Sequence, residues 1–70
     1  MFVHVDTIEG HNEVQVHVMV SDDIDLDVTA NYNDVCAFAR ESASVSEDYR
    51  IAEVDALEGD PTVCVVFMRD

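Results

Sequence analysis

The residues with the clearest capacity for chemistry are the aspartates that crowd between Ser21 and Asp34, in the stretch SDDIDLDVTANYND. From Asp23 to Val28 aspartate alternates with an aliphatic residue, and such alternation favours a half-buried extended segment. The carboxylates would then form a comb on the solvent side, with neighbours about 6.6 Å apart. Such a comb attracts cations or the arginine and lysine side chains of a basic partner. It is therefore the leading candidate for a contact surface.

The same stretch partly matches the calcium-binding loop of an EF-hand, which places oxygen ligands at fixed positions. With Asp23 as position one, oxygen-bearing residues occupy positions three, five and seven, and Asp34 occupies position twelve. Val28 stands where the loop needs glycine for its sharp turn, and no helix is expected before the loop. A divalent-cation-binding domain is therefore an alternative, and no cofactor or metal ligand is assigned.

Histidines and cysteines are the other residues that can bind metals or act as nucleophiles. His4 and His17 are expected to face each other across a hairpin with Asp6 beside them, and such a group can bind zinc or copper, although no fourth ligand is evident. Cys36 and Cys64 fit neither a zinc spacing nor a disulfide framework, so both are expected to be buried reduced thiols. Neither cysteine has a basic neighbourhood that would favour a thiolate. We therefore do not expect an enzyme.

The net charge is the abnormal quantity in the composition. Sixteen acidic residues stand against three arginines and no lysine, giving a formal charge of −13 in 70 residues. A magnitude of about two to eight is enough for solubility. Nucleic acid and anionic membranes are repelled by such a charge, whereas basic proteins and cations are attracted. The expected partner is therefore a basic protein, not nucleic acid or a membrane.

The remaining composition describes a small folded domain. Apolar residues make up 49% of the chain, which is too many for a disordered acidic tail. A chain of 70 residues buries only about 60% of its unfolded surface, which leaves little room for a deep active site. No apolar run approaches the roughly 20 residues of a membrane span, and the first residues lack the features of a signal peptide. A cytoplasmic location is expected.

The elements that must position these residues begin with a hairpin. Residues 2–8 and 13–20 both alternate, and Gly10 and His11 offer a two-residue turn between them. The valines of both segments would then share one face and belong to the core, while the opposite face is largely polar and solvated and carries Phe2 and the facing histidines. The pairs that this turn implies are Val3 with Val18, Val5 with Val16 and Thr7 with Val14.

A helix is expected to follow the acidic stretch. Apolar residues at helical spacing predict a core helix over residues 30–43. Thr29 or Asn31 could cap it, and Asp34 suits the positive end of the helix dipole. A longer helix beginning at Ser21 is an alternative, and it would spread the aspartates around its first turns.

Residues 49–57 and 62–68 flank a turn rich in glycine, aspartate and proline and predict a second hairpin. The second segment is apolar on both faces, which marks a central strand. The first could instead be a helix capped by residues 46–48. The sum is a single α+β domain over residues 1–70, of order ββαββ, with one antiparallel sheet and the helix packed on its valine face.

In size, in a high negative charge carried without lysine, and in this small architecture, the chain resembles the acidic DNA-mimic proteins of phages, including some anti-CRISPR proteins. The resemblance implies an inhibitor in the host cytoplasm that occupies the basic DNA- or RNA-binding groove of a partner such as a CRISPR defence complex. The acidic residues that carry the resemblance, and that we expect to bind the partner, are Asp22, Asp23, Asp25, Asp27, Asp34, Glu47, Asp48, Glu53 and Asp55.

The same charge also fits a domain adapted to molar salt, as in haloarchaea, where acidic surfaces keep proteins hydrated. The absence of lysine and the excess of aspartate over glutamate are typical of that habit. Two cysteines, three methionines and three phenylalanines fit it less well. A salt-adapted domain is therefore kept beside the DNA-mimic hypothesis.

Overall fold

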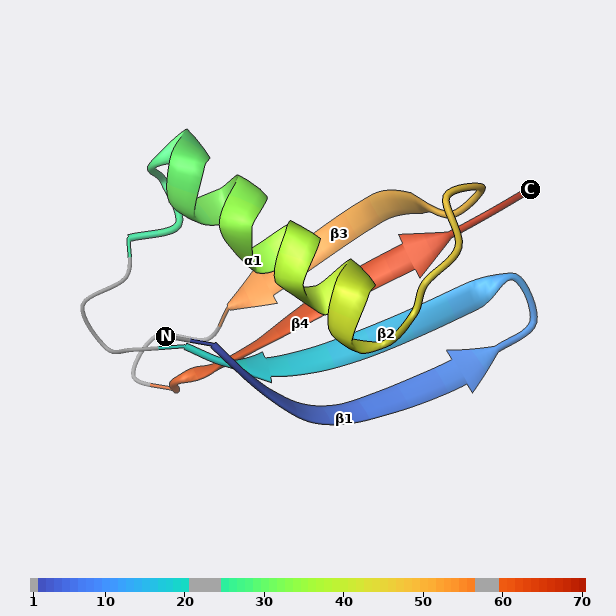
Figure 1. The fold of residues 1–70 in the computed structure, drawn as a ribbon, viewed down its shortest axis with the longest axis horizontal. Coiled ribbons are helices and arrows are strands. Elements are labelled where there is room, and N and C mark those ends of the chain that lie inside the picture. Colours follow the sequence, from blue (N-terminus) through green and yellow to red (C-terminus); the bar gives the residue numbers. More distant parts are fainter. Residues whose placement is uncertain (1, 21–24, 57–59) are drawn as a thin grey trace.

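The computed structural model describes residues 2–20, 25–56 and 60–70, and Figure 1 shows a helix lying across one face of a sheet. The elements are β1 (Val3–Gly10), β2 (Glu13–Met19), α1 (Thr29–Ser42), β3 (Arg50–Ala56) and β4 (Thr62–Met68). The strands lie in the order β1-β2-β4-β3, and every neighbouring pair is antiparallel. The predicted α+β architecture of order ββαββ is confirmed.

The core lies between α1 and the two central strands, β2 and β4. The prediction that residues 62–68 form a central strand is confirmed, because β4 pairs with β2 on one side and with β3 on the other. Alternation places every second residue of β2 and β4 under the helix. We call this side of the sheet the covered face. The buried residues of the core are Val14, Val16, Val18, Val35, Cys36, Ala39, Val63, Val65 and Phe67.

The first hairpin has a different register from the predicted one. Its two-residue turn is formed by His11 and Asn12, and Gly10 pairs with Glu13 inside the ladder. Asn12 takes a positive φ of 59°, a conformation that asparagine tolerates better than most residues. The ladder is also irregular between His4 and Asp6. The observed pairs include His4 with Val18, Asp6 with His17 and Thr7 with Val16.

This register and the edge position of β1 keep its valines out of the core. Val3 and Val5 are each 51% exposed, so the predicted valine surface is formed by β2 and β4 and not by β1. Phe2, predicted to lie on the solvated face, packs against the core with its ring centroid 5.5 Å from that of Phe38. β1 is therefore an extension of the sheet beyond the part that α1 buries.

The helix begins at Thr29, close to the predicted start, but no side chain caps it. The residue before it, Val28, is extended, so the alternative of a helix running from Ser21 is wrong over the described residues that precede Thr29. Beyond the other end of α1, Ser44 takes a positive φ of 54° and the chain turns toward β3. The strand prediction for the segment after it is confirmed, and the helical alternative is wrong.

Candidate functional site

Asp25 and Asp27, the described aspartates before α1, lie in a turn and not in an extended comb. The amide of Val28 donates to the carbonyl of Asp25 at 3.2 Å, and the carboxylate of Asp25 accepts from the amide of Asp27 at 3.0 Å. The side chain of Asn31 also donates to the carbonyl of Asp25 at 2.9 Å, which joins the turn to the first turn of the helix. The predicted extended segment is therefore wrong for residues 25–27, although Val28 itself is extended. Asp22 and Asp23 lie outside the described residues.

The same geometry excludes an EF-hand-like loop over the described part of this stretch. Such a loop needs Thr29 and Asp34 to wrap around one ion from positions seven and twelve. Thr29, at position seven, already begins the helix, so the backbone there rises along an axis and does not continue a loop around an ion. The EF-hand-like spacing of these residues in the sequence therefore does not produce an EF-hand-like loop over the described residues.

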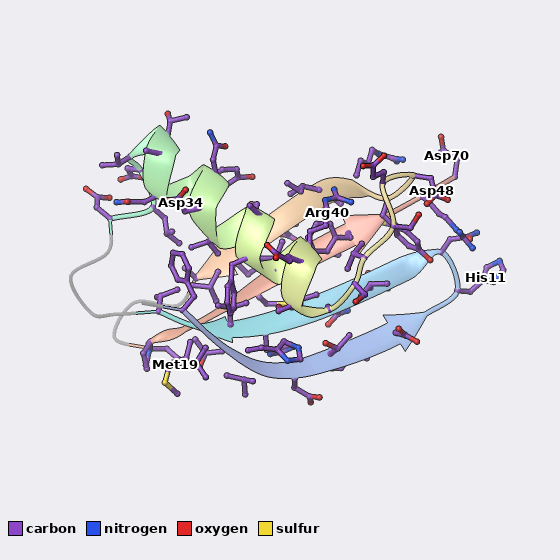
Figure 2. All side chains as sticks on the ribbon, viewed as in Figure 1. His11, Met19, Asp34, Arg40, Asp48 and Asp70 are labelled. Atoms are coloured by element: carbon purple, nitrogen blue, oxygen red, sulfur yellow. The ribbon has the colours of Figure 1, made fainter. Side chains whose placement is uncertain are left out.

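The acidic residues at the two ends of α1 are far apart, as Figure 2 shows for Asp34 and Asp48. Asp34 is exposed on the helix, whereas Glu47 and Asp48 follow it in the turn before β3. Asp48 accepts a hydrogen bond from the Ser46 hydroxyl and pairs with Arg69 at 3.1 Å. The Ser46 bond first, and the Arg69 bond second, lower the pKa of Asp48.

Glu53 and Asp55 lie on a third surface, the side of the sheet turned away from α1. Residues directly opposite each other in neighbouring strands share a face, so the register defines this surface, which we call the uncovered face. The described members of the predicted acidic contact set therefore do not converge on one surface. The residues of the uncovered face are Val3, Asp6, Ile8, Glu13, Gln15, His17, Met19, Arg50, Glu53, Asp55, Thr62, Cys64, Val66 and Met68.

All three arginines are engaged within the chain. Arg40 donates to the carbonyls of Ser46 at 2.7 Å and Tyr49 at 2.9 Å, and its guanidinium lies 4.9 Å from the centre of the Phe67 ring. Arg50 pairs with the carboxylate of Asp70 at 3.1 Å. Arg69, besides its bond to Asp48, donates to the side chain of Asn12 and stacks on the Tyr49 ring. The three guanidinium groups therefore form intramolecular bonds with the turns and with the C-terminal residue.

A row of polar side chains crosses the four strands of the uncovered face. Asp6 is opposite His17, His17 is opposite Cys64, and Cys64 is opposite Asp55. The Nε2 atom of His17 lies 3.8 Å from the Sγ atom of Cys64. This row replaces the expected pair of His4 and His17, which is wrong because the turn at His11 and Asn12 shifts the register and places Asp6 opposite His17.

The sequence analysis missed the pairing of His17 with Cys64. His4 is opposite Val18, and its Nε2 atom contacts the Thr7 hydroxyl at 2.6 Å. A periodicity argument places His17 and Cys64 each on the outer face of a strand. Only the pairing of β2 with β4, which are far apart in the chain, brings the two together.

Neither cysteine is set up as a nucleophile. Burial raises the pKa of the Cys64 thiol, and the negative charges of Asp55, Glu53 and Glu13 raise it further. Burial also raises the pKa of the Cys36 thiol, against smaller opposing contributions from a Tyr32 hydrogen bond and from Arg40. Both cysteines are free thiols, as expected, but of the two only Cys36 is fully buried and Cys64 is half-buried. At neutral pH the protonated thiol dominates at both positions.

The described residues contain no group of three or more histidine, cysteine or acidic side chains that converge as a ready metal site. A groove of about 610 Å³ is lined by residues that include Cys36, Arg40, Val45, Glu47 and Ile51. The Arg40 guanidinium in this groove is already bonded to two carbonyls. The groove therefore offers a ligand apolar contact and carboxylates, and its one cationic group already serves the fold.

Comparisons of the chain with protein-family models, with curated proteins and with solved structures found no match. Among the described residues, α1 is the single helix, and it is neither long nor apolar enough to cross a membrane. The functional argument therefore depends on the charge, the placement of the acidic groups and the polar row of the uncovered face.

Proposed function

We propose that this chain is an acidic binding protein whose partner is a basic protein surface, such as the groove in which a nucleic-acid-binding protein holds DNA or RNA. The observation that carries the proposal is the engagement of all three arginines inside the chain. Among the described carboxylates, those of Asp48 and Asp70 form the ion pairs. The other described acidic side chains are exposed or half-buried and remain available to a partner.

A groove built for nucleic acid is the basic surface that such a protein fits best. It presents many lysine and arginine side chains in succession, and each carboxylate that replaces a phosphate there releases condensed counterions. Arginine meets a carboxylate with two parallel hydrogen bonds, so affinity does not require a deep pocket on the acidic protein. Binding of this kind is fast and weakens as the salt concentration rises.

The acidic end of α1 is the part of the molecule that we assign to direct contact. Asp25 and Asp27 lie in the turn that Asn31 ties to the helix, and Asp34 is exposed on the helix itself. Asp22 and Asp23 precede them in the sequence. Glu47, Asp48, Glu53 and Asp55 lie on other surfaces, so their role is to strengthen the long-range field that steers the encounter. In its most specific form the proposal is an inhibitor of a bacterial CRISPR complex acting in the host cytoplasm.

The test is displacement of DNA or RNA from basic proteins. A fluorescent duplex is bound to a CRISPR surveillance complex, and to a panel of other basic nucleic-acid-binding proteins, at about 0.15 M salt. The expected result is a fall in anisotropy as the acidic protein is added, with a midpoint that rises with salt. Failure to displace nucleic acid from any member of the panel would contradict the proposal.

A matched pair of variants tests which carboxylates make the contact. Changing Asp22, Asp23, Asp25 and Asp27 to Asn is expected to preserve the fold, to stabilise it slightly by easing repulsion, and to abolish displacement. The control removes the same four charges elsewhere, at exposed positions outside the contact set, with Asp6→Asn, Glu9→Gln, Glu41→Gln and Asp60→Asn. Equal loss in both variants would mean that net charge alone decides binding.

A second candidate function class, a domain adapted to molar salt, is favoured by one specific observation. The acidic residues are spread over both ends of α1 and over the uncovered face, and not gathered on one side. A protein that must stay hydrated in molar salt needs carboxylates over its whole surface. An interface needs them only where the partner lies.

Thermal unfolding in low and in molar KCl separates the two classes. A protein this acidic gains stability from salt in either case, because screening weakens self-repulsion. A cooperative transition above about 50 °C at physiological salt supports the binding protein. A chain that folds only in molar salt supports salt adaptation.

A further inference from the structure

The uncovered face carries two metal-ligand atoms that already lie at a suitable separation. The Sγ atom of Cys64 and the Nε2 atom of His17 are 3.8 Å apart. In tetrahedral zinc sites the metal lies about 2.3 Å from sulfur and about 2.0 Å from nitrogen, which places the two ligand atoms about 3.5 Å apart. A shift of a few tenths of an ångström would therefore let both atoms bind one ion.

We propose that His17 and Cys64 bind a divalent metal ion of the zinc class on the uncovered face, with Asp55 as the third protein ligand. The inference is independent of the proposed function, because it rests on a thiol and an imidazole and not on the net charge. The proposed site differs from both metal sites considered from the sequence, the pair of His4 and His17 and the EF-hand-like stretch.

The backbone holds these two residues in place. His17 and Cys64 are directly opposite each other on the two central strands, and both side chains are half-buried. The neighbours of His17 and Cys64 along the chain, Val16 and Val65 among them, are fully buried in the core on the covered face. The separation of the two ligands is therefore set by the most rigid part of the fold.

The third ligand comes from the strand beyond Cys64. Asp55 is directly opposite Cys64, and side chains in that relation have Cβ atoms about 5 Å apart. No three such groups converge among the described residues as they stand, so the Asp55 carboxylate must rotate toward the ion, and water completes the tetrahedron. On binding, Cys64 releases its thiol proton to solvent and His17 offers the lone pair of Nε2.

The charges around the row favour a cation. Asp6 is opposite His17, and Glu53 and Glu13 lie close enough to Cys64 to act on it electrostatically. The one arginine of the uncovered face, Arg50, is opposite Met68 and pairs with Asp70. The field at the site is therefore negative, and the sulfur and imidazole ligands select zinc-like metals over calcium or magnesium.

The test is a titration of the reduced protein with Co²⁺ in the presence of excess Mg²⁺, at about 0.15 M salt. Magnesium occupies loose carboxylate sites but competes poorly for sulfur and nitrogen ligands. The expected result is a thiolate-to-cobalt absorption band that saturates at one equivalent and disappears when Zn²⁺ is added. Absence of the band in the wild-type protein would overturn the proposal.

Variants identify the ligands. Cys64→Ser should abolish the band, and His17→Gln should weaken Co²⁺ binding by about tenfold or more. Asp55→Asn should weaken it less, because water can replace one oxygen ligand. The control is His11→Gln, which changes an exposed histidine of the first turn and should leave binding unchanged. Equal affinity in wild type and Cys64→Ser would mean only loose association of cations with the acidic surface.

A measurement on the wild-type chain keeps the proposal testable if a variant fails to fold. Zn²⁺ should slow alkylation of Cys64, read by mass spectrometry of the peptide that contains it. Mg²⁺ at the same concentration should not slow it. Alkylation of Cys64 at the same rate with and without Zn²⁺ would overturn the assignment.

Discussion

The two faces of the sheet are made by the same strands but tolerate very different residues. On the covered face, β2 and β4 present only valines and one phenylalanine, and α1 closes over them. On the uncovered face, the intervening positions of the same strands mix polar and apolar residues, namely Glu13, Gln15, His17, Met19, Thr62, Cys64, Val66 and Met68. Because the covered face already provides the core, the residues opposite it are free to serve binding. The difference separates the part of the chain that determines the fold from the part that can carry chemistry.

The largest expected effect tests whether the covered face supplies the stability. Phe67 is fully buried and also supports the Arg40 guanidinium, so Phe67→Ala should cost about 3–5 kcal/mol of unfolding free energy. Met68 is the next residue, 38% exposed on the uncovered face, and Met68→Ala should cost about 0.5 kcal/mol. Urea unfolding followed by circular dichroism measures both. Similar losses in the two variants would show that the faces contribute equally.

A smaller effect tests the position of β1 at the edge of the core. Val16 is fully buried and Val5 is 51% exposed, although the predicted register made the two valines partners in the core. Val16→Ala should lower the unfolding free energy by about 2 kcal/mol, from two buried methyl groups and the space that they leave. Val5→Ala should lower it by about 0.5 kcal/mol or less. Equal losses of unfolding free energy in the two variants would mean that Val5 belongs to the core, as the predicted register required.

The smallest effect concerns Asp48, which is exposed in the turn before β3 and belongs to neither face of the sheet. Its pKa in the folded state is lowered from 3.8 by the Ser46 and Arg69 bonds, so the carboxylate stabilises the fold above that value and loses its effect as the pH falls through the folded pKa. The difference in melting temperature between wild type and Asp48→Asn should therefore be greatest at neutral pH and vanish in acid. In a Ser46→Ala background this dependence should shrink. A difference that is constant with pH would contradict the assigned cause.

The order of elements could be predicted because each carries a local signal. Alternation marks the strands, helical spacing marks the helix, and the apolar stretch from Thr62 to Met68 marks a central strand. The predicted register of the first hairpin failed because it depended on which residues form a two-residue turn. Gly10 is the more common turn residue, but Asn12 adopts the positive φ. Moving the turn by one position changes each residue's partner but not its face, and the irregularity between His4 and Asp6 then moves Val3 to the uncovered face, opposite Met19.

The acidic residues show the same limit. Alternation from Asp23 to Val28 predicts an extended segment, but the Asp25 carboxylate bonds to the backbone two residues on and forms a turn before the helix. Aspartate competes for local backbone hydrogen bonds, and an alternation of residue types carries no information about that competition. The separation of Asp34, Asp48 and Asp55 onto different surfaces follows from the crossing of α1 over the sheet.

The sequence by itself determined the fold class, the order of the elements, the central strand and the net charge, because hydrophobic periodicity and composition are local properties. Only the tertiary structure decided which acidic residues share a surface and that His17 meets Cys64. Those two residues come from strands separated by the helix and the edge strand β3 in the chain. Their meeting depends on the register of long-range strand pairing, which is set by the packing of the valine face under α1 and not by any signal near either residue.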